Sequence, residues 1–175
     1  MNIVMLKLKG LIAAVIVMLL CCSIVSCKQN DNATKEKVSD EVILKDYGPE
    51  PIVLDIENYT NTNDNFRTAL WTGTYLQLTL MSIPVGGEIG LELHTDTDQF
   101  IRIEEGNAKI LMGDAKESLT FEKVAESDFV IIIPAGKWHN IINIGDKPLK
   151  VYSIYSPVEH PHGTTHITAE DDNHE

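Results

Sequence analysis

Four residues in two stretches of the sequence carry side chains that bind metals or transfer protons. Glu92 and His94 lie two residues apart in the segment Leu-Glu-Leu-His, and on a strand such side chains point to the same face. Gln99 follows a Thr-Asp-Thr-Asp turn, and a hairpin across that turn places it beside His94. His139 comes shortly after a Pro-Ala-Gly turn, at the start of another strand. We expect the four groups to converge if these strands line one barrel.

Two imidazoles and one carboxylate suit a divalent ion such as Fe(II), Mn, Ni or Zn and leave positions for water and substrate. We therefore expect one metal ion bound by Glu92, His94 and His139. Gln99 is a fourth ligand, a support to a ligand or a substrate contact, because a neutral amide binds metal more weakly than a carboxylate. Glu92 is also the candidate catalytic base. The alternative is that the histidines are only hydrogen-bonded on a barrel face.

The elements that must position these residues are short strands separated by turns. Residues 66–156 alternate apolar and polar side chains, as in Leu-Gln-Leu-Thr-Leu at 76–80, between turns rich in Gly, Asp and Asn. Residues 52–56 are the first strand candidate, and residues 59–65 form a loop by composition. No stretch predicts a long amphipathic helix. The pattern predicts an all-β sandwich or small barrel.

The order and spacing of these residues resemble the two motifs of the cupin superfamily. Motif G-x5-H-x-H-x3-4-E-x6-G is matched by Glu92, His94, Gln99 and Gly106, and motif G-x5-P-x-G-x2-H-x3-N by Pro134, Gly136, His139 and Asn143. Glu92 stands at a histidine position, Gln99 at the glutamate position and Asp128 at the first glycine of the second motif. The resemblance spans residues 66–160 and implies a single-domain jelly-roll barrel, a double-stranded β-helix.

The resemblance also implies a class of function. Glu, His, Gln and His are the residue types of the zinc set in cupin-type phosphomannose isomerases, with the places of Gln and Glu exchanged. A small single-domain cupin of this kind implies a metal-dependent isomerase or oxygenase acting on a sugar, sugar phosphate or organic acid. The alternatives are a non-catalytic cupin that binds a small ligand at the cell envelope and a structural homodimer.

The N-terminus has the layout of a secretory signal. Lys7 and Lys9 precede an apolar core at residues 11–20, and Ile24-Val-Ser-Cys27 resembles the lipobox of bacterial lipoproteins. We expect a signal peptide over residues 1–26, a lipid anchor on Cys27 that holds the exported protein in the cell envelope, and a polar tether over 27–50. The cupin barrel then spans 51–160, and an acidic, histidine-containing tail spans 161–175. A plain signal peptide or a single-pass anchor is the alternative.

The net charge of −12 argues against nucleic acid as a partner. The expected partners are a small-molecule ligand or substrate, the membrane through the lipid anchor, and a second copy in a homodimer. Arg67 is a candidate contact for an anionic substrate. Tyr155 is expected in the core, and the segment from His160 onwards is expected to run as irregular coil.

Overall fold

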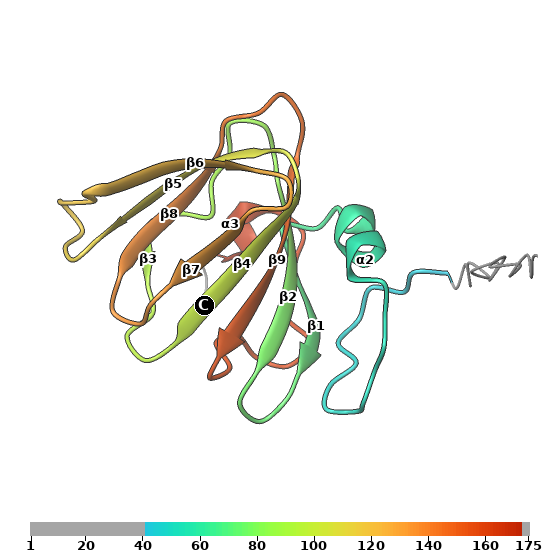
Figure 1. Cartoon of the computed structure of the whole chain (residues 1–175). Helices are drawn as coiled ribbons and strands as arrows, with labels where there is room; N and C mark the ends of the chain where they lie inside the picture. The colour runs from blue at the N-terminus through green and yellow to red at the C-terminus, as the bar shows by residue number, and fades with distance from the viewer. Residues whose placement is uncertain (1–40, 173–175) are drawn as a thin grey trace, which may run out of the picture. The chain divides into compact units, whose positions relative to one another are not determined.

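The computed structural model describes residues 41–172, which form two antiparallel sheets packed against each other (Figure 1). The strands are β1 (Arg67–Thr72), β2 (Gln77–Ile83), β3 (Glu92–Leu93), β4 (Asp98–Glu105), β5 (Asn107–Gly113), β6 (Phe121–Glu126), β7 (Val130–Ile133), β8 (Trp138–Asn143), β9 (Leu149–Ser156) and β10 (Thr165–His166). The helices are α2 (Ile56–Thr62) and α3 (Ala169–Asp172). This arrangement confirms the predicted all-β jelly roll.

The six-stranded sheet carries a row of polar side chains across three neighbouring strands. Its strand order is β10-β1-β2-β9-β4-β7, and the other sheet has the order β3-β8-β5-β6. Gln77 of β2 lies opposite Tyr155 of β9, which in turn lies opposite Gln99 of β4. All three are at most 2% exposed. Because residues opposite one another share a face, the row lines the interior.

An apolar core fills the rest of the interior. Further along the same three strands, Met81 and Ile83 of β2, Ile103 of β4 and Val151 of β9 are at most 1% exposed. They belong to one cluster that also includes Ile141 from the opposite sheet. Burial of each such side chain contributes about 1.5–3 kcal/mol, so this cluster holds the sheets together. The polar row therefore occupies a separate end of the interior.

The structure explains which residues stand at two positions of the second cupin motif. Asn143 is 1% exposed, and its side-chain nitrogen donates to the carbonyl oxygens of Ile83, Pro84 and Lys147, which fixes the loops at one end of the barrel. Asp128 stands at the motif's first glycine and has a positive φ of 73°. Aspartate tolerates this left-handed conformation better than most residues, so the turn keeps its glycine-like backbone.

Three predictions of local structure are wrong in whole or in part. Residues 52–56 form no strand: helix α2 begins at Ile56, with the Asp55 side chain accepting from the Asn58 amide at 3.2 Å. This helix also takes up most of the predicted loop at 59–65 and lies beside β2, β4 and β9 (Figure 1). The segment from His160, expected as coil, is irregular in part but also forms β10, which pairs with β1, and helix α3.

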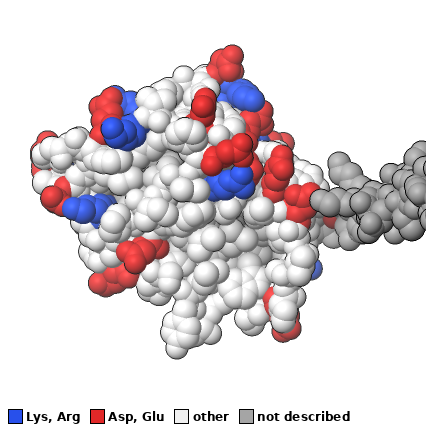
Figure 2. All heavy atoms as spheres, viewed as in Figure 1, with Lys and Arg blue, Asp and Glu red and all other residues white. Residues whose placement is uncertain are grey.

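Charged side chains are spread over the face shown in Figure 2, and most basic groups in that view lie beside acidic ones. The described residues include the ion pairs Lys109–Glu122 at 2.9 Å and Arg102–Asp128 at 2.6 Å. The predicted signal peptide, Cys27, most of the tether and residues 173–175 lie outside the described residues. Within residues 41–172, no helix has the length and apolar character needed to cross a bilayer.

Candidate metal centre

Glu92 and His139 face each other across two paired strands, and His94 follows on the same face. The two-residue strand β3 pairs with β8 so that Glu92 lies directly opposite His139. His94 lies two residues beyond Glu92, and the pleat sends both side chains to one side. One nitrogen of each imidazole and one oxygen of Glu92 lie within 4.8 Å of one another. The fold thus brings together the three residues whose spacing suggested a site.

The separations between these atoms match the geometry of a single ion. Glu92 Oε1 is 3.1 Å from His139 Nε2 and 3.3 Å from His94 Nε2. An ion with bonds of about 2.0–2.2 Å holds neighbouring donor atoms about 3.0–3.5 Å apart. Among residues 41–172, His94 Nε2 is a buried atom without a hydrogen-bond partner, which costs free energy unless a ligand occupies it. The donor set therefore fits one divalent cation.

Each imidazole is oriented by a hydrogen bond at Nδ1, which turns its Nε2 towards Glu92. His139 Nδ1 lies 2.9 Å from the carbonyl oxygen of Lys137, which can only accept, so this nitrogen carries the proton. His94 Nδ1 lies 2.9 Å from the carboxylate oxygen Oε1 of Glu159 and donates in the same way. Such bonds to the outer nitrogen orient a ligating histidine and raise its basicity. Both Nε2 atoms therefore face Glu92. His139 Nε2 lies within hydrogen-bond distance of Glu92 Oε1, at 3.1 Å, and a bound ion would replace this contact.

Gln99 lies in the polar row next to this cluster. Its side-chain nitrogen donates to the Tyr155 hydroxyl at 3.0 Å, whereas its carbonyl oxygen Oε1 is buried and has no partner among the described residues. An amide carbonyl oxygen is a weaker metal ligand than a carboxylate but accepts hydrogen bonds well. Its free oxygen leaves Gln99 available both as a fourth ligand and as a substrate contact.

The cluster holds Glu92 in its ionised form. Burial raises the pKa of Glu92, but the contacts with His139 and His94 and the charge of Arg67 outweigh it and hold the pKa well below the ordinary value. Burial lowers the pKa of His94, but Glu92 and Glu159 outweigh it and raise the pKa above the ordinary value. A carboxylate of such low basicity is a good anionic ligand and a weak proton acceptor.

Arg67 lies behind the cluster in a buried polar network. It is 1% exposed and donates to the Tyr155 hydroxyl at 3.0 Å, to His160 Nε2 at 2.5 Å and to the Asp172 carboxylate at 2.9 Å. The Tyr155 ring is fully buried, as predicted, but its hydroxyl links Arg67 to Gln99. The guanidinium thus binds protein groups in this structure, where the sequence suggested an anionic substrate.

Sequence reasoning did not place Glu159, His160 or Asp172 in the site; the first two end the predicted barrel, and Asp172 belongs to the predicted acidic tail. Glu159 contacts His94 across 65 positions, and Asp172 contacts Arg67 across 105. Neither pair lies on a common strand or obeys a motif spacing. The clustering of histidines with acids in this segment was a visible signal, but it does not specify a partner.

His160 provides a test of this network through acid stability. Burial and the nearby Arg67 charge lower the pKa of His160 to about 3. The unfolded chain therefore binds a proton between about pH 6.5 and 3 that the folded chain does not. The free energy of unfolding therefore decreases as the pH falls through this window, by up to about 1.4 kcal/mol per pH unit.

Urea unfolding at pH 7 and pH 4.5 measures this effect, and His160→Gln should lose less unfolding free energy between the two pH values than wild type does. The exposed control His162→Gln should behave as wild type, and equal losses in all three proteins would contradict the buried neutral imidazole.

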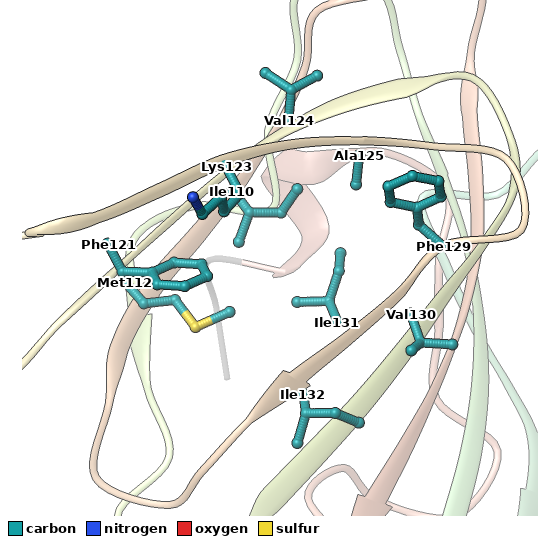
Figure 3. Close-up of a pocket in the computed structure, with 10 residues that line it drawn as sticks. All are labelled: Ile110, Met112, Phe121, Lys123, Val124, Ala125, Phe129, Val130, Ile131 and Ile132. Atoms are coloured by element: carbon teal, nitrogen blue, oxygen red, sulfur yellow. The ribbon is translucent and has the colours of Figure 1, made fainter.

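A separate hollow lies between β5, β6 and β7 and is almost entirely apolar (Figure 3). Phe121, Met112 and Ile131 point into it, and Lys123 is the one charged residue that lines it. No carboxylate or imidazole of the described chain lines this hollow. It therefore offers apolar contact area but no group for acid–base or metal chemistry.

Comparison with known proteins identifies relatives of this chain. Residues 79–155 match the cupin domain family. The Bacillus subtilis protein YrkC is 52% identical over 130 residues, which cover 74% of this chain and 70% of the relative. A protein of Acanthamoeba polyphaga mimivirus is 41% identical over 112 residues, which cover 63% of this chain and 68% of the relative.

Solved structures of other proteins are also similar to this chain. A crystal structure of a Bacillus halodurans protein is 52% identical, covers 74% of this chain and 98% of its own, and superposes with a TM-score of 0.73. A Klebsiella pneumoniae protein with a double-stranded β-helix domain is 15% identical, covers 68% of this chain and all of its own, and has a TM-score of 0.52, a likeness of fold alone. With the jelly roll, both motifs and these relatives in agreement, this chain belongs to the cupin superfamily.

Proposed function

We propose that this cupin holds one divalent metal ion through Glu92, His94 and His139 and uses it to convert a small polar substrate. The observation that carries the proposal is the convergence of one carboxylate oxygen and two Nε2 atoms at 3.1 and 3.3 Å. When bound, an ion in such a site polarises a carbonyl or hydroxyl group, or activates O₂ if it is iron. The substrate classes that suit this chemistry are sugars, sugar phosphates and organic acids.

The chain's own residues divide the work in this proposal. Glu92 contributes the negative charge that balances the cation, since its carboxylate is ionised. His94 and His139 are held by their Nδ1 hydrogen bonds, so little reorganisation is needed on binding. Gln99 offers its free carbonyl oxygen either to the ion or to a substrate hydroxyl. The Tyr155 hydroxyl orients that amide.

Metal loading followed by an activity screen tests the enzyme assignment. The full chain is stripped of metal, reloaded separately with Fe(II), Mn, Ni or Zn, and assayed for sugar phosphate isomerisation and for O₂ uptake with organic acids. We expect turnover with at least one ion and none in the stripped protein or in the reloaded His139→Ala variant. Absence of turnover with every ion and substrate class would contradict an enzyme and leave the binding function.

Ligand binding without turnover is the second candidate function, and the state of Glu92 favours it. Glu92 Oε1 lies 3.1 Å from His139 Nε2 and 3.3 Å from His94 Nε2, so this carboxylate is engaged by both imidazoles and is not free to take a proton from a substrate. The same cluster can instead bind a hydroxyl or carboxylate of a ligand through its ion. Calorimetric titration of the metal-loaded chain, followed by recovery of the ligand, separates the two functions. A binder returns the ligand unchanged, whereas an enzyme returns product.

A further inference from the structure

Residues 157–172, here called the strap, cross back over the polar end of the barrel after β9. The Gln77 side chain binds the main chain of His160 through both of its polar atoms, donating to the carbonyl at 2.8 Å and accepting from the amide at 2.9 Å. The His160 ring packs edge-on against Tyr155 at 5.2 Å between centroids. Arg67 then binds both His160 and Asp172. The strap is therefore fixed to the barrel at two points 12 residues apart, one on either side of β10.

The strap delivers one carboxylate directly to the metal cluster. Glu159, next to the anchored His160, places Oε1 2.9 Å from His94 Nδ1. The His94 side chain is 8% exposed and that of Glu159 is 28% exposed, so the bond is shielded from most competing water. The Nε2 atom of the same ring is the buried, unpartnered atom that faces Glu92. The Glu159 carboxylate, the His94 ring and the expected position of the metal are thus linked by consecutive contacts.

The two histidines differ in how they are supported. His139 donates its Nδ1 proton to the Lys137 carbonyl two residues away, at the start of its own strand, so its support forms whenever β8 forms. His94 instead depends on a residue 65 positions further along the chain. Residue 159 also lies beyond the segment that matches the cupin family, 79–155. The support of His94 therefore comes from outside the stretch that matches the cupin family.

We propose that Glu159 is a positioning residue that fixes the tautomer and orientation of His94, so that docking of the strap determines metal affinity. This inference rests on the proposed metal site. Loss of a carboxylate that supports a ligating histidine typically weakens metal binding by about 10–100-fold. Glu159→Ala should therefore bind Zn or Co(II) at least about tenfold more weakly than wild type. Glu159→Gln keeps an oxygen that accepts from His94 Nδ1, so its metal affinity should lie between those of wild type and Glu159→Ala.

The test measures metal affinity by chelator competition at one fixed pH, with Glu170→Ala and Glu170→Gln as matched controls. Glu170 is an exposed acid of the same segment, in α3, so these variants remove the same charge away from the cluster. Both controls should bind as wild type does. Proton NMR of the Co(II)-loaded protein supplies a second readout. Wild type should show two exchangeable, paramagnetically shifted imidazole N–H signals, and Glu159→Ala should lose or broaden the one from His94.

Three other outcomes of these measurements would overturn the inference. Equal affinity in Glu159→Ala and Glu170→Ala, with both N–H signals kept, would show that Glu159 has no positioning role while leaving the metal site intact. Equal losses in Glu159→Gln and Glu159→Ala, with an altered Co(II) absorption spectrum, would make Glu159 a direct ligand instead. No stoichiometric metal in wild type would overturn the metal site together with this inference. If Glu159→Ala does not fold, the nearly isosteric Glu159→Gln still decides, through its affinity and the position of its His94 N–H signal.

Discussion

His139→Ala is expected to abolish stoichiometric metal binding, with an affinity loss well above the roughly 10–100-fold typical of a residue that only supports a ligand. His139 is fully buried and supplies one of the three convergent donor atoms. Its removal leaves Glu92 and His94, and two protein ligands hold a divalent ion far more weakly than three. Elemental analysis of purified protein and calorimetric titration of the stripped protein measure the effect.

The matched control is His162→Ala, which removes an exposed imidazole from the strap. His162 Nε2 lies 3.1 Å from the Gly48 carbonyl oxygen and 3.6 Å from Asp46 Oδ1, and His162 is not one of the three residues of the metal cluster. The metal content of His162→Ala should equal that of wild type. Equal metal in His139→Ala and wild type would mean that the ion, if any, binds elsewhere on the protein.

Arg67→Met is expected to cost about 3–5 kcal/mol of unfolding free energy, the largest stability effect anticipated for a single substitution here. Burial lowers the pKa of Arg67, but Tyr155, Asp172 and Glu92 outweigh it and keep the guanidinium charged. Methionine fills much of the volume but gives no hydrogen bond to Tyr155, His160 or Asp172. The partly buried Asp172 carboxylate then loses its cation, and the strap loses the side chain that ties it at two points.

Urea unfolding followed by tryptophan fluorescence measures this loss, and Lys109→Met is its control. Lys109 also pairs with an acid, Glu122, but on the surface, where water replaces the lost contact. Its substitution should change stability much less. Similar midpoints for the two variants would show that the buried network contributes no more than an ordinary surface ion pair.

The barrel is largely predictable from the sequence because its determinants are local. Alternation with a period of two marks the faces of β2, β4 and β9, and turn residues such as Gly136, with a φ of 79°, mark where strands end. Helix α2 escaped prediction because seven residues are too few for a helical period to show. Residues 52–54 look like a strand from composition, yet Val53 is fully exposed, so no packing supports one.

The site is predictable only where the strand pleat and a short turn determine it. Glu92 and His94 share a face through their spacing, and the partnership of β3 with β8 adds His139. The supports of this cluster depend on contacts across 65 and 105 positions, between Glu159 and His94 and between Asp172 and Arg67. Such contacts follow from the path of the strap over the barrel, and no local pattern encodes that path.

The 105-residue separation of Arg67 and Asp172 also sets an order of events during synthesis. At about 5–20 residues per second, a ribosome makes the arginine roughly 5–20 s before its carboxylate partner. Throughout that interval the guanidinium must stay hydrated, and Glu159 has not yet been translated for most of it. Full assembly of the cluster is therefore a late maturation step, after the nascent barrel strands are already available to pair.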